Sequence, residues 1–287
     1  INGAGSSSFL LGRMSYITSV CRPEVRGRVI AMLAGSMRGA ALFGPLAGAA
    51  IVEIAGFDVA FFVAAGMAVA GFLAIALFAL HEQPLLRDLR FRSMFTLIVE
   101  YRKVFSTAGV AAIVFMLMRS ARTVLIPLIG AAIGLDVGAI GFIVSASATI
   151  DVALFYPAGL IMDKFGRRST AVPSSALMAV SIATMALAGG FKSLLAVALL
   201  AGVANGLSTG IVMALGTDLA PADRRSEFLG MWRLLTDFGT AAGPMAIGLV
   251  VAVSPISIAC LAIAVLGGAG SYTIYRYVEE TLVTRQA

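Results

Sequence analysis

The chain has 287 residues, of which 60% are hydrophobic and 13% are charged, and its mean hydropathy is +0.98. Soluble domains carry about 25% charged residues, so this composition excludes a protein whose whole surface faces water. The net charge of +6 does not indicate nucleic-acid binding. The basic residues stand in short clusters between apolar runs, as they do in the cytoplasmic loops of membrane proteins.

Apolar runs of about 20 residues predict an all-α membrane protein with about nine spanning helices. In chain order the runs lie at 1–20, 29–52, 58–80, 106–130, 137–161, 170–190, 193–216, 228–251 and 254–276. The first run begins at Ile1 rather than at a Met, and it lacks a signal-peptide pattern. We therefore expect that natural sequence is missing upstream.

The connectors between the runs alternate in charge. One set, which includes 21–28, 81–103 and 163–168, carries most of the Lys and Arg residues, whereas the other set carries only Lys192. By the positive-inside rule, the basic set and the C-terminus face the cytoplasm of a cell (inner) membrane. The long connector also contains an amphipathic stretch, which we expect to lie on the membrane surface.

The long connector divides the chain into groups of helices. The predicted units are the last three helices of an N-terminal half-bundle at 1–80, a cytoplasmic linker at 81–105, a six-helix bundle at 106–276 and a cytoplasmic tail at 277–287. An internal repeat relates the two groups, since Arg26 aligns with Arg225 and Gly44-Pro45 aligns with Gly243-Pro244. Parallel repeats of this kind are typical of transporters built from two half-bundles. Because the first group lacks three helices of the second, we expect twelve helices in the full protein.

The connector between the second and third helices of the six-helix group carries a specific pattern. Its residues are Gly159, Asp163, Lys164, Gly166, Arg167 and Arg168. The pattern resembles the loop signature of the major facilitator superfamily, and 26–28 is similar to that family's loop between helices four and five. The resemblance implies a helical-bundle secondary transporter that works by alternating access, with this chain covering helices four to twelve. The loop would then be a conformational element, in which Asp163 faces the positive N-terminus of the helix that starts near Arg28. The simpler alternative is that its basic residues only set the topology.

A second pattern concerns helices that bend or pack closely. Its residues are Gly44, Pro45 and Gly48 and, in the repeat copy, Gly239, Gly243 and Pro244. They resemble part of the family's antiporter signature, which implies proton-coupled efflux. The alternatives are a proton-coupled uptake symporter for a small metabolite, or ordinary packing of membrane helices by small residues.

Charged residues inside apolar runs are candidates for function, because burying a charge in a bilayer is costly. Arg38 follows Arg26 by twelve residues, and Asp151 precedes Asp163 by twelve, so both lie about 18 Å from the cytoplasmic surface. In the resembled fold, the helices that carry Arg38 and Asp151 meet at the interface between the half-bundles. The resemblance therefore implies an ion pair of Arg38 with Asp151 that couples proton binding to movement. A static salt bridge is the alternative.

Other intramembrane charges are candidates for the cavity and the substrate site, because the helix that carries Arg119 and Arg122 lines the cavity in the resembled fold. Arg119 and Arg122 share one helix face, so either is an alternative partner for Asp151, and both could hold an anionic group of a substrate. By the repeat, Asp237 corresponds to Arg38, and Arg233 lies one turn before it. Asp237 is expected to pair with a group on the missing helices.

Several classes of protein are disfavoured. The chain has one histidine, two widely spaced cysteines and no nucleotide-binding loop, so it indicates no metal site, no cofactor and no direct use of ATP. A polytopic membrane enzyme would need a cluster of His, Asp or Ser, which is absent from the sequence. The expected partners are the lipid bilayer, protons and a small-molecule substrate, without nucleic acid. The full-length protein is expected to be monomeric.

Overall fold

The computed structural model describes residues 23–78, 91–208, 210–278 and 280. All regular elements in these ranges are helices, which agrees with the predicted all-α class. The helix predicted at 1–20 lies outside the described residues, as do most of the predicted linker and most of the tail.

The helices follow the predicted runs closely. They are α2 (Pro23–Phe78), α3 (Phe91–Glu100), α4 (Arg102–Val104), the π-helical turn η1 (Phe105–Gly109), α5 (Val110–Ala132), α6 (Val137–Phe165), α7 (Arg167–Met185), α8 (Phe191–Leu207), α9 (Ile211–Leu219), α10 (Arg225–Val251) and α11 (Ile256–Tyr277). Six stretches of the described part are long and apolar enough to cross a membrane. The protein is therefore a multi-pass membrane protein, and the number nine stays a prediction.

Two features explain why the six strongly apolar stretches do not match the predicted helices of the same region one to one. The first stretch runs through Gly56, where a positive φ of 83° bends α2 into two arms, one for each predicted helix. The helix α7 fills the predicted run at 170–190 but is too rich in Ser and Thr to count as a strongly apolar span. Its hydroxyls, such as those of Ser174 and Ser181, donate to carbonyls of the preceding turn and so are satisfied within the helix.

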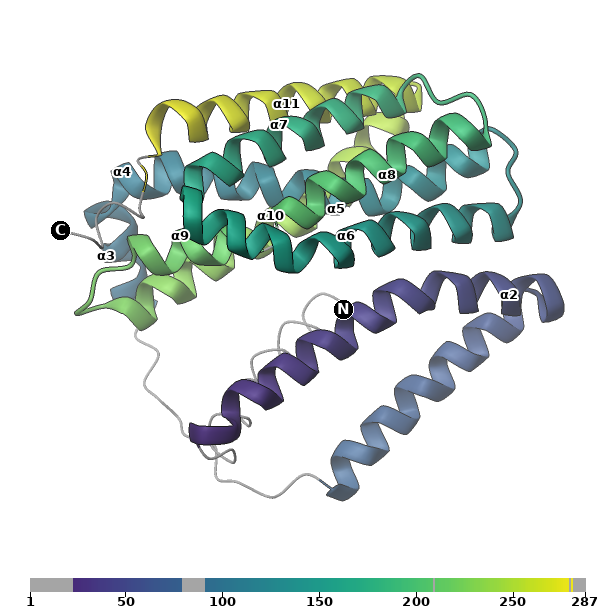
Figure 1. Ribbon diagram of the computed structural model, residues 1–287, viewed down its shortest axis with the longest axis horizontal. Helices are drawn as coiled ribbons and strands as arrows, with labels where there is room; N and C mark the ends of the chain where they lie inside the picture. Colours follow the sequence, from purple (N-terminus) through teal and green to yellow (C-terminus); the bar gives the residue numbers. More distant parts are fainter. Residues whose placement is uncertain (1–22, 79–90, 209, 279, 281–287) are drawn as a thin grey trace.

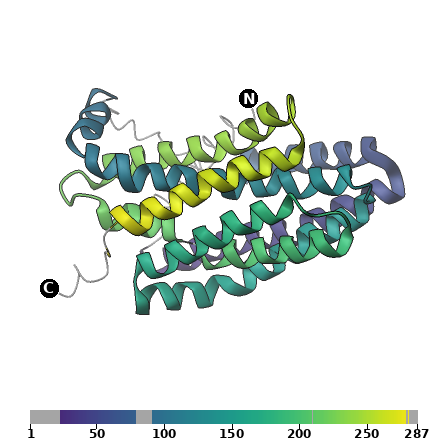
Figure 2. The same ribbon diagram turned by 90° about the horizontal axis from the view of Figure 1, so that it is seen from above.

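Helices α5 to α11 form one bundle in which α6 packs on α8, α5 on α10, and α7 on α11 (Figure 1). Turned by 90°, the bundle shows the same helices running nearly parallel along its length (Figure 2). Its apolar core includes Met118, Leu125, Ile143, Met178 and Ile182, all of them buried. The predicted unit 106–276 covers these helices, and its role as a separate half-bundle stays a prediction.

The amphipathic connector forms α3 at one end of the bundle. Leu97 is fully buried there, and the ring of Tyr101 meets Phe228 of α10 edge to face, with centroids 6.0 Å apart. The apolar side of this segment therefore packs on the start of α10, and Val99 on its other side is exposed.

The helix α2 lies beside the bundle and contacts α6 through its first arm (Figure 1). A Cβ added at Gly141 of α6 would lie 2.7 Å from the Cβ of Ala49 and 3.0 Å from the carbonyl oxygen of Pro45. These contacts gather near the start of α6 and the bend of α2. Further along α6, Tyr156 and Leu160 are exposed. The contacts between the described side chains of the two helices thus gather toward the start of α6.

Candidate functional site

Three polar side chains from three helices meet halfway along the bundle. They are Arg122 on α5, Asp151 on α6 and Asn205 on α8. The Asn205 side-chain amide donates a hydrogen bond to Oδ2 of Asp151, at 2.5 Å. One terminal nitrogen of Arg122, Nη2, lies 4.0 Å from the same oxygen. The group therefore joins one carboxylate to a cation and an amide.

The position of this group follows from helix lengths. Asp151 stands 14 residues after the first residue of α6, and Asn205 stands 14 residues after the first residue of α8. At 1.5 Å per residue both lie about 21 Å along their helices, close to the middle of a bilayer-spanning bundle. Since α6 and α8 are packed side by side, equal positions along them bring the two side chains together.

Two glycines of α8 make this close approach possible. A Cβ at Gly202 would lie 2.5 Å from the carbonyl oxygen of Ser147, and one at Gly206 would lie 2.9 Å from the carbonyl oxygen of Asp151. Small residues four apart let membrane helices pack backbone against backbone. Gly202 and Gly206 therefore set the distance between α6 and α8 at the polar group.

Arg122 is largely buried, with 12% of its side chain exposed. Its Nη1 donates to Oγ of Ser147 at 3.2 Å, and that hydroxyl donates to the carbonyl of Ala198 at 2.7 Å. Its Nε has no acceptor among the described residues. Arg119 lies on the preceding turn, close enough for the two cations to repel one another. The Arg122 guanidinium is thus held in place by Ser147, while its Nε–H donor has no described acceptor.

The predicted partner of Asp151 at the interface between halves, Arg38, has a side chain outside the described part of the chain, so that pairing stays a prediction. The alternative partner on the preceding helix, Arg122, lies in contact with Asp151. Asp151 keeps 26% of its side chain exposed. It is therefore accessible as well as paired.

The other predicted intramembrane charges pair with each other. Nε of Arg233 lies 3.0 Å from both carboxylate oxygens of Asp237, one turn later on α10. Both side chains are partly exposed, and the structure does not bring them to the group at Asp151. The expected partner of Asp237 on a missing helix stays a prediction.

The loop pattern forms a charged cluster at the far end of α6. Arg167 is buried, and its Nε donates to Oδ2 of Asp218 on α9 at 2.9 Å, while Nη1 lies 3.4 Å from Oδ1 of Asp163. Asp163 is 71% exposed, so Asp218 is the closer and better shielded partner. The predicted contact of Asp163 with the helix near Arg28 stays a prediction, because the side chains near Arg28 lie outside the described part of the chain.

The same loop is held by the end of the chain. The backbone N–H groups of Arg167 and Arg168 donate to the carboxylate of Glu280, at 2.8 and 3.0 Å. The guanidinium of Arg168 donates to the Tyr275 carbonyl and lies 4.9 Å from that residue's ring centroid. Gly166 has a φ of 98°, and a Cβ there would overlap the Glu280 carboxylate. Of the remaining loop residues, Gly159 has no described atom within 4 Å of an added Cβ, and Nζ of Lys164 lies 5.3 Å from the Phe165 ring centroid.

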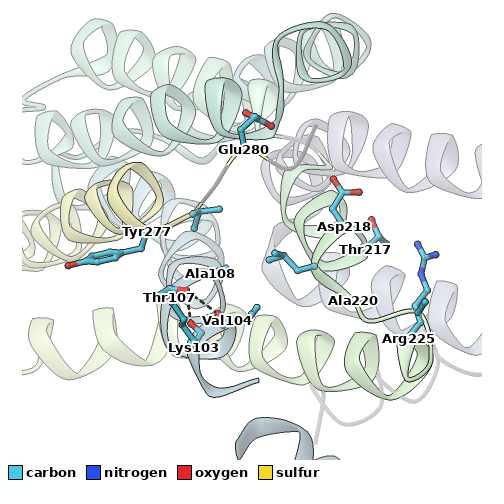
Figure 3. A pocket seen from close by; sticks show the side chains of 13 residues that line it. Lys103, Val104, Thr107, Ala108, Thr217, Asp218, Ala220, Arg225, Tyr277 and Glu280 are labelled. Atoms are coloured by element: carbon cyan, nitrogen blue, oxygen red, sulfur yellow. Dashed lines mark hydrogen bonds between the residues drawn. The ribbon is translucent and has the colours of Figure 1, made fainter. Parts of the chain in front are cut away.

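A cavity of about 650 Å³ opens beside this cluster, between η1, α9, the start of α10 and the end of α11 (Figure 3). Lys103, Arg225, Asp218 and Glu280 line it, but both carboxylates are already engaged with the start of α7. A second cavity of about 360 Å³ lies between α2, α6 and α8, lined by Leu46, Phe142, Ser145, Ala146, Thr149, Ile150 and Leu199. The larger cavity is therefore remote from the intramembrane charges, and the smaller one adjoins α6 just before Asp151.

The two copies of the Gly-Pro pattern differ in how closely their glycines pack against neighbouring helices. Cβ atoms at Gly239 and Gly243 of α10 would clash with the backbone of α5, the latter at 2.7 Å from the Leu117 carbonyl oxygen. Gly44 and Gly48 of α2 have no described atom within 4 Å of such a position. The second copy thus serves close helix packing, and Pro45 contacts α6 through its carbonyl.

Sequence reasoning did not single out Asn205, Ser147 or Glu280 as site residues. The signal for Asn205 was present, because it is one of two asparagines in the chain and stands inside an apolar run. Gly202 and Gly206, four apart on the same helix, were a second signal. Glu280 carried none, because an acidic residue in a polar tail has many possible partners.

Comparisons with known proteins agree with this architecture. No curated protein matches the sequence. Among solved structures, the chain is similar to a crystal structure of a D-xylose-proton symporter, with a TM-score of 0.62 and 16% identity over 93% of this chain and 67% of the symporter chain. At that identity the likeness shows the fold alone. The sequence model of the Major Facilitator Superfamily matches residues 1–118 and 108–286. The chain therefore belongs to the Major Facilitator Superfamily, and its general function is secondary transport rather than catalysis.

Proposed function

We propose that this protein is a proton-coupled transporter of a small molecule, in which the carboxylate of Asp151 takes up and releases the coupling proton. The observation that carries this proposal is the contact of Asp151 with Arg122 in the middle of the bundle. A carboxylate at that depth depends on its cation for stability as an anion. A movement that separates the two groups therefore changes whether Asp151 holds a proton.

The proposed movement is alternating access between the two half-bundles. It is supported by the parallel repeat and by the described contacts of α2 with α6, which gather toward the start of α6. The cluster at Arg167 ties the ends of α6, α7, α9 and α11 together, so that they move as one body. In this proposal the protein lies in the cell (inner) membrane with its C-terminus in the cytoplasm, as the basic connectors indicate.

Two directions of coupling are consistent with this scheme. The Gly44-Pro45 and Gly243-Pro244 patterns favour efflux of a substrate in exchange for protons. The contact of Asp151 with Arg122 also allows uptake of a substrate together with protons. Arg119, Arg122, Arg233 and Asp237 are the proposed cavity charges in either case.

The proton role can be tested with the intact protein reconstituted into liposomes that contain a trapped pH-sensitive dye. A transported substrate should change the internal pH, and Asp151→Asn should abolish that change while leaving exchange of labelled substrate for unlabelled substrate measurable. Asp58→Asn, which alters an exposed carboxylate on α2, is the matched control and should behave like the native protein. Proton movement that persists in the Asp151 variant would refute the proposal.

A further inference from the structure

We infer that Arg122 binds an anionic group of the substrate in competition with Asp151, so that the transported molecule is a small oxyanion that moves in the same direction as the proton. The inference rests on the proposed proton role of Asp151 and adds the class of substrate to it. It is carried by the geometry of Arg122.

The described residues leave donors of the Arg122 guanidinium unused. It has five N–H donors, of which one reaches Ser147 at 3.2 Å, while the approach to Asp151 is 4.0 Å and so too long for a hydrogen bond. Its buried Nε has no described acceptor. A buried donor without an acceptor is costly, and a carboxylate or phosphate can accept from two guanidinium nitrogens at once. An oxyanion therefore completes this site.

The charges around Asp151 argue against a cationic substrate. From α5 it faces Arg122, with Arg119 one turn behind. From α8 it faces Asn205, whose amide presents a donor to the carboxylate. A cation would have to displace Arg122 and approach Arg119, whereas an anion is attracted by both.

Two further carboxylates could in principle influence Asp151. They are Glu53 and Asp58 of α2, which lie near the bend at Gly56. The Glu53 carboxylate lies beside Gly138, at the start of α6 and far along that helix from Asp151. The described groups in contact with Asp151 are thus one cation, Arg122, and one amide, Asn205.

This arrangement makes proton and anion binding support one another. A proton neutralises Asp151 and releases Arg122. The free guanidinium of Arg122 then binds the anion by donating hydrogen bonds to it. Linkage is reciprocal, so a bound anion also favours the proton. One proton and one monovalent anion add no net charge to the middle of the membrane, and this lowers the cost of moving the loaded site across it. Both ligands therefore travel together.

Binding can be tested on the intact purified protein with lactate, succinate and inorganic phosphate as anionic probes and tetraphenylphosphonium as a cationic probe, at matched ionic strength. At least one anion should raise the melting temperature. Its affinity should be roughly tenfold higher near pH 5.5 than near pH 8, within the 5- to 150-fold range that coupled sites commonly show. No stabilisation by any of the three anions would overturn the inference.

Variants separate this site from a structural role of the ion pair. Asp151→Asn should bind the anion near pH 8 about as tightly as the native protein does near pH 5.5, and the pH dependence should disappear. Arg122→Lys should keep the fold but lose most of the affinity, because lysine lacks the two-pronged geometry. The neutral pair Arg122→Gln with Asp151→Asn should fold and bind no anion. Arg276→Gln, a control at the exposed end of α11, should bind normally. Anion binding that survives in the neutral pair would overturn the inference.

The liposome assay distinguishes failure of this inference from failure of the proton role. If an anionic probe added outside the liposomes acidifies their interior, the result supports both the anionic substrate and the proton role of Asp151. Interior alkalinisation on adding the cationic probe, abolished in Asp151→Asn, overturns the anionic substrate but keeps the proton role of Asp151. Proton movement with either probe that is unaffected by Asp151→Asn, or none with any probe, rejects both.

Discussion

Glu280 caps α7 by accepting a hydrogen bond from the backbone N–H of Arg167 at 2.8 Å and one from its neighbour at 3.0 Å. The first N–H groups of a helix have no partner within the helix, and the helix dipole makes this end positive. A carboxylate from the end of the chain satisfies both requirements. The contact joins residues more than 100 positions apart, and it locks the loop pattern to the end of α11.

Removal of this cap should lower the stability of the bundle. Glu280→Ala is expected to cost about 1 to 2 kcal/mol, in the range of lost helix caps. Glu280→Gln should cost less, because an amide oxygen still accepts one hydrogen bond. Thermal unfolding in detergent measures the loss. The matched control is Glu100→Gln, which removes an exposed partner of Arg224 and should change little. Equal melting temperatures for Glu280→Ala and the control would contradict the cap.

The two glycines of the loop pattern should respond differently to substitution. Gly166→Ala is expected to destabilise the protein by roughly 1 to 3 kcal/mol, because the residue has positive φ and its Cβ would overlap the Glu280 carboxylate. Gly159→Ala has open space in a helix and should be neutral or stabilising by up to about 1 kcal/mol. Comparison of the two melting temperatures tests both statements. A similar loss in both variants would show that the conformation at 166 is not special.

Arg167 should matter more than Asp163, although both belong to the loop pattern. Arg167→Gln leaves the buried Asp218 without its cation, and breaking such a pair typically costs about 3 to 5 kcal/mol. Asp163→Asn removes an exposed partner and should cost under about 1 kcal/mol. The double variant Arg167→Met with Asp218→Leu should regain much of the loss. Urea titration of the purified protein provides the free energies, and failure of the double variant to regain stability would point to a further role for one of its residues.

Close packing at the polar group can be tested at Gly206. Gly206→Ala places a methyl group 2.9 Å from the carbonyl oxygen of Asp151, so α8 must move away from α6. We expect a loss of about 1 to 3 kcal/mol, typical of overpacking, together with weaker transport. Gly248→Ala on α10 has no atom within 4 Å and serves as the control. Full transport and stability in Gly206→Ala would contradict the proposed spacing.

The junction between α3 and α4 should be sensitive to alkaline pH. The pKa of Tyr101 is raised above 10.0 by desolvation and by the neighbouring carboxylate of Glu100. A group whose pKa is higher in the folded state stabilises the fold below its unfolded pKa and loses that contribution as the pH rises through the folded value. Tyr101→Phe should therefore unfold less readily than the native protein above about pH 10. Melting curves of both proteins across this pH range check the difference.

Much of the fold could be predicted because hydropathy is a local property of the chain. The apolar runs gave helix positions within a few residues, as at 228–251 against Arg225–Val251. They also separated the two arms of α2 on either side of Gly56 and placed a helix at α7. The bend itself and the burial of the α7 hydroxyls depend on backbone conformation and on neighbouring helices rather than on local composition.

For the candidate site, the sequence predicted which charged residues are involved but not which of them meet. An ionisable residue in an apolar run is visible in the sequence, so Asp151 and Arg122 stood out at once. Their choice of partner depends on which helices touch and on rotation about each helix axis. The hydropathy of an isolated segment does not contain either property. Packing of α8 against α6 through Gly202 and Gly206 brought Asn205 to Asp151, and the tertiary fold brought Glu280 to Gly166. Composition thus decided that the chain enters a membrane, whereas contacts between distant segments decided where its charges meet.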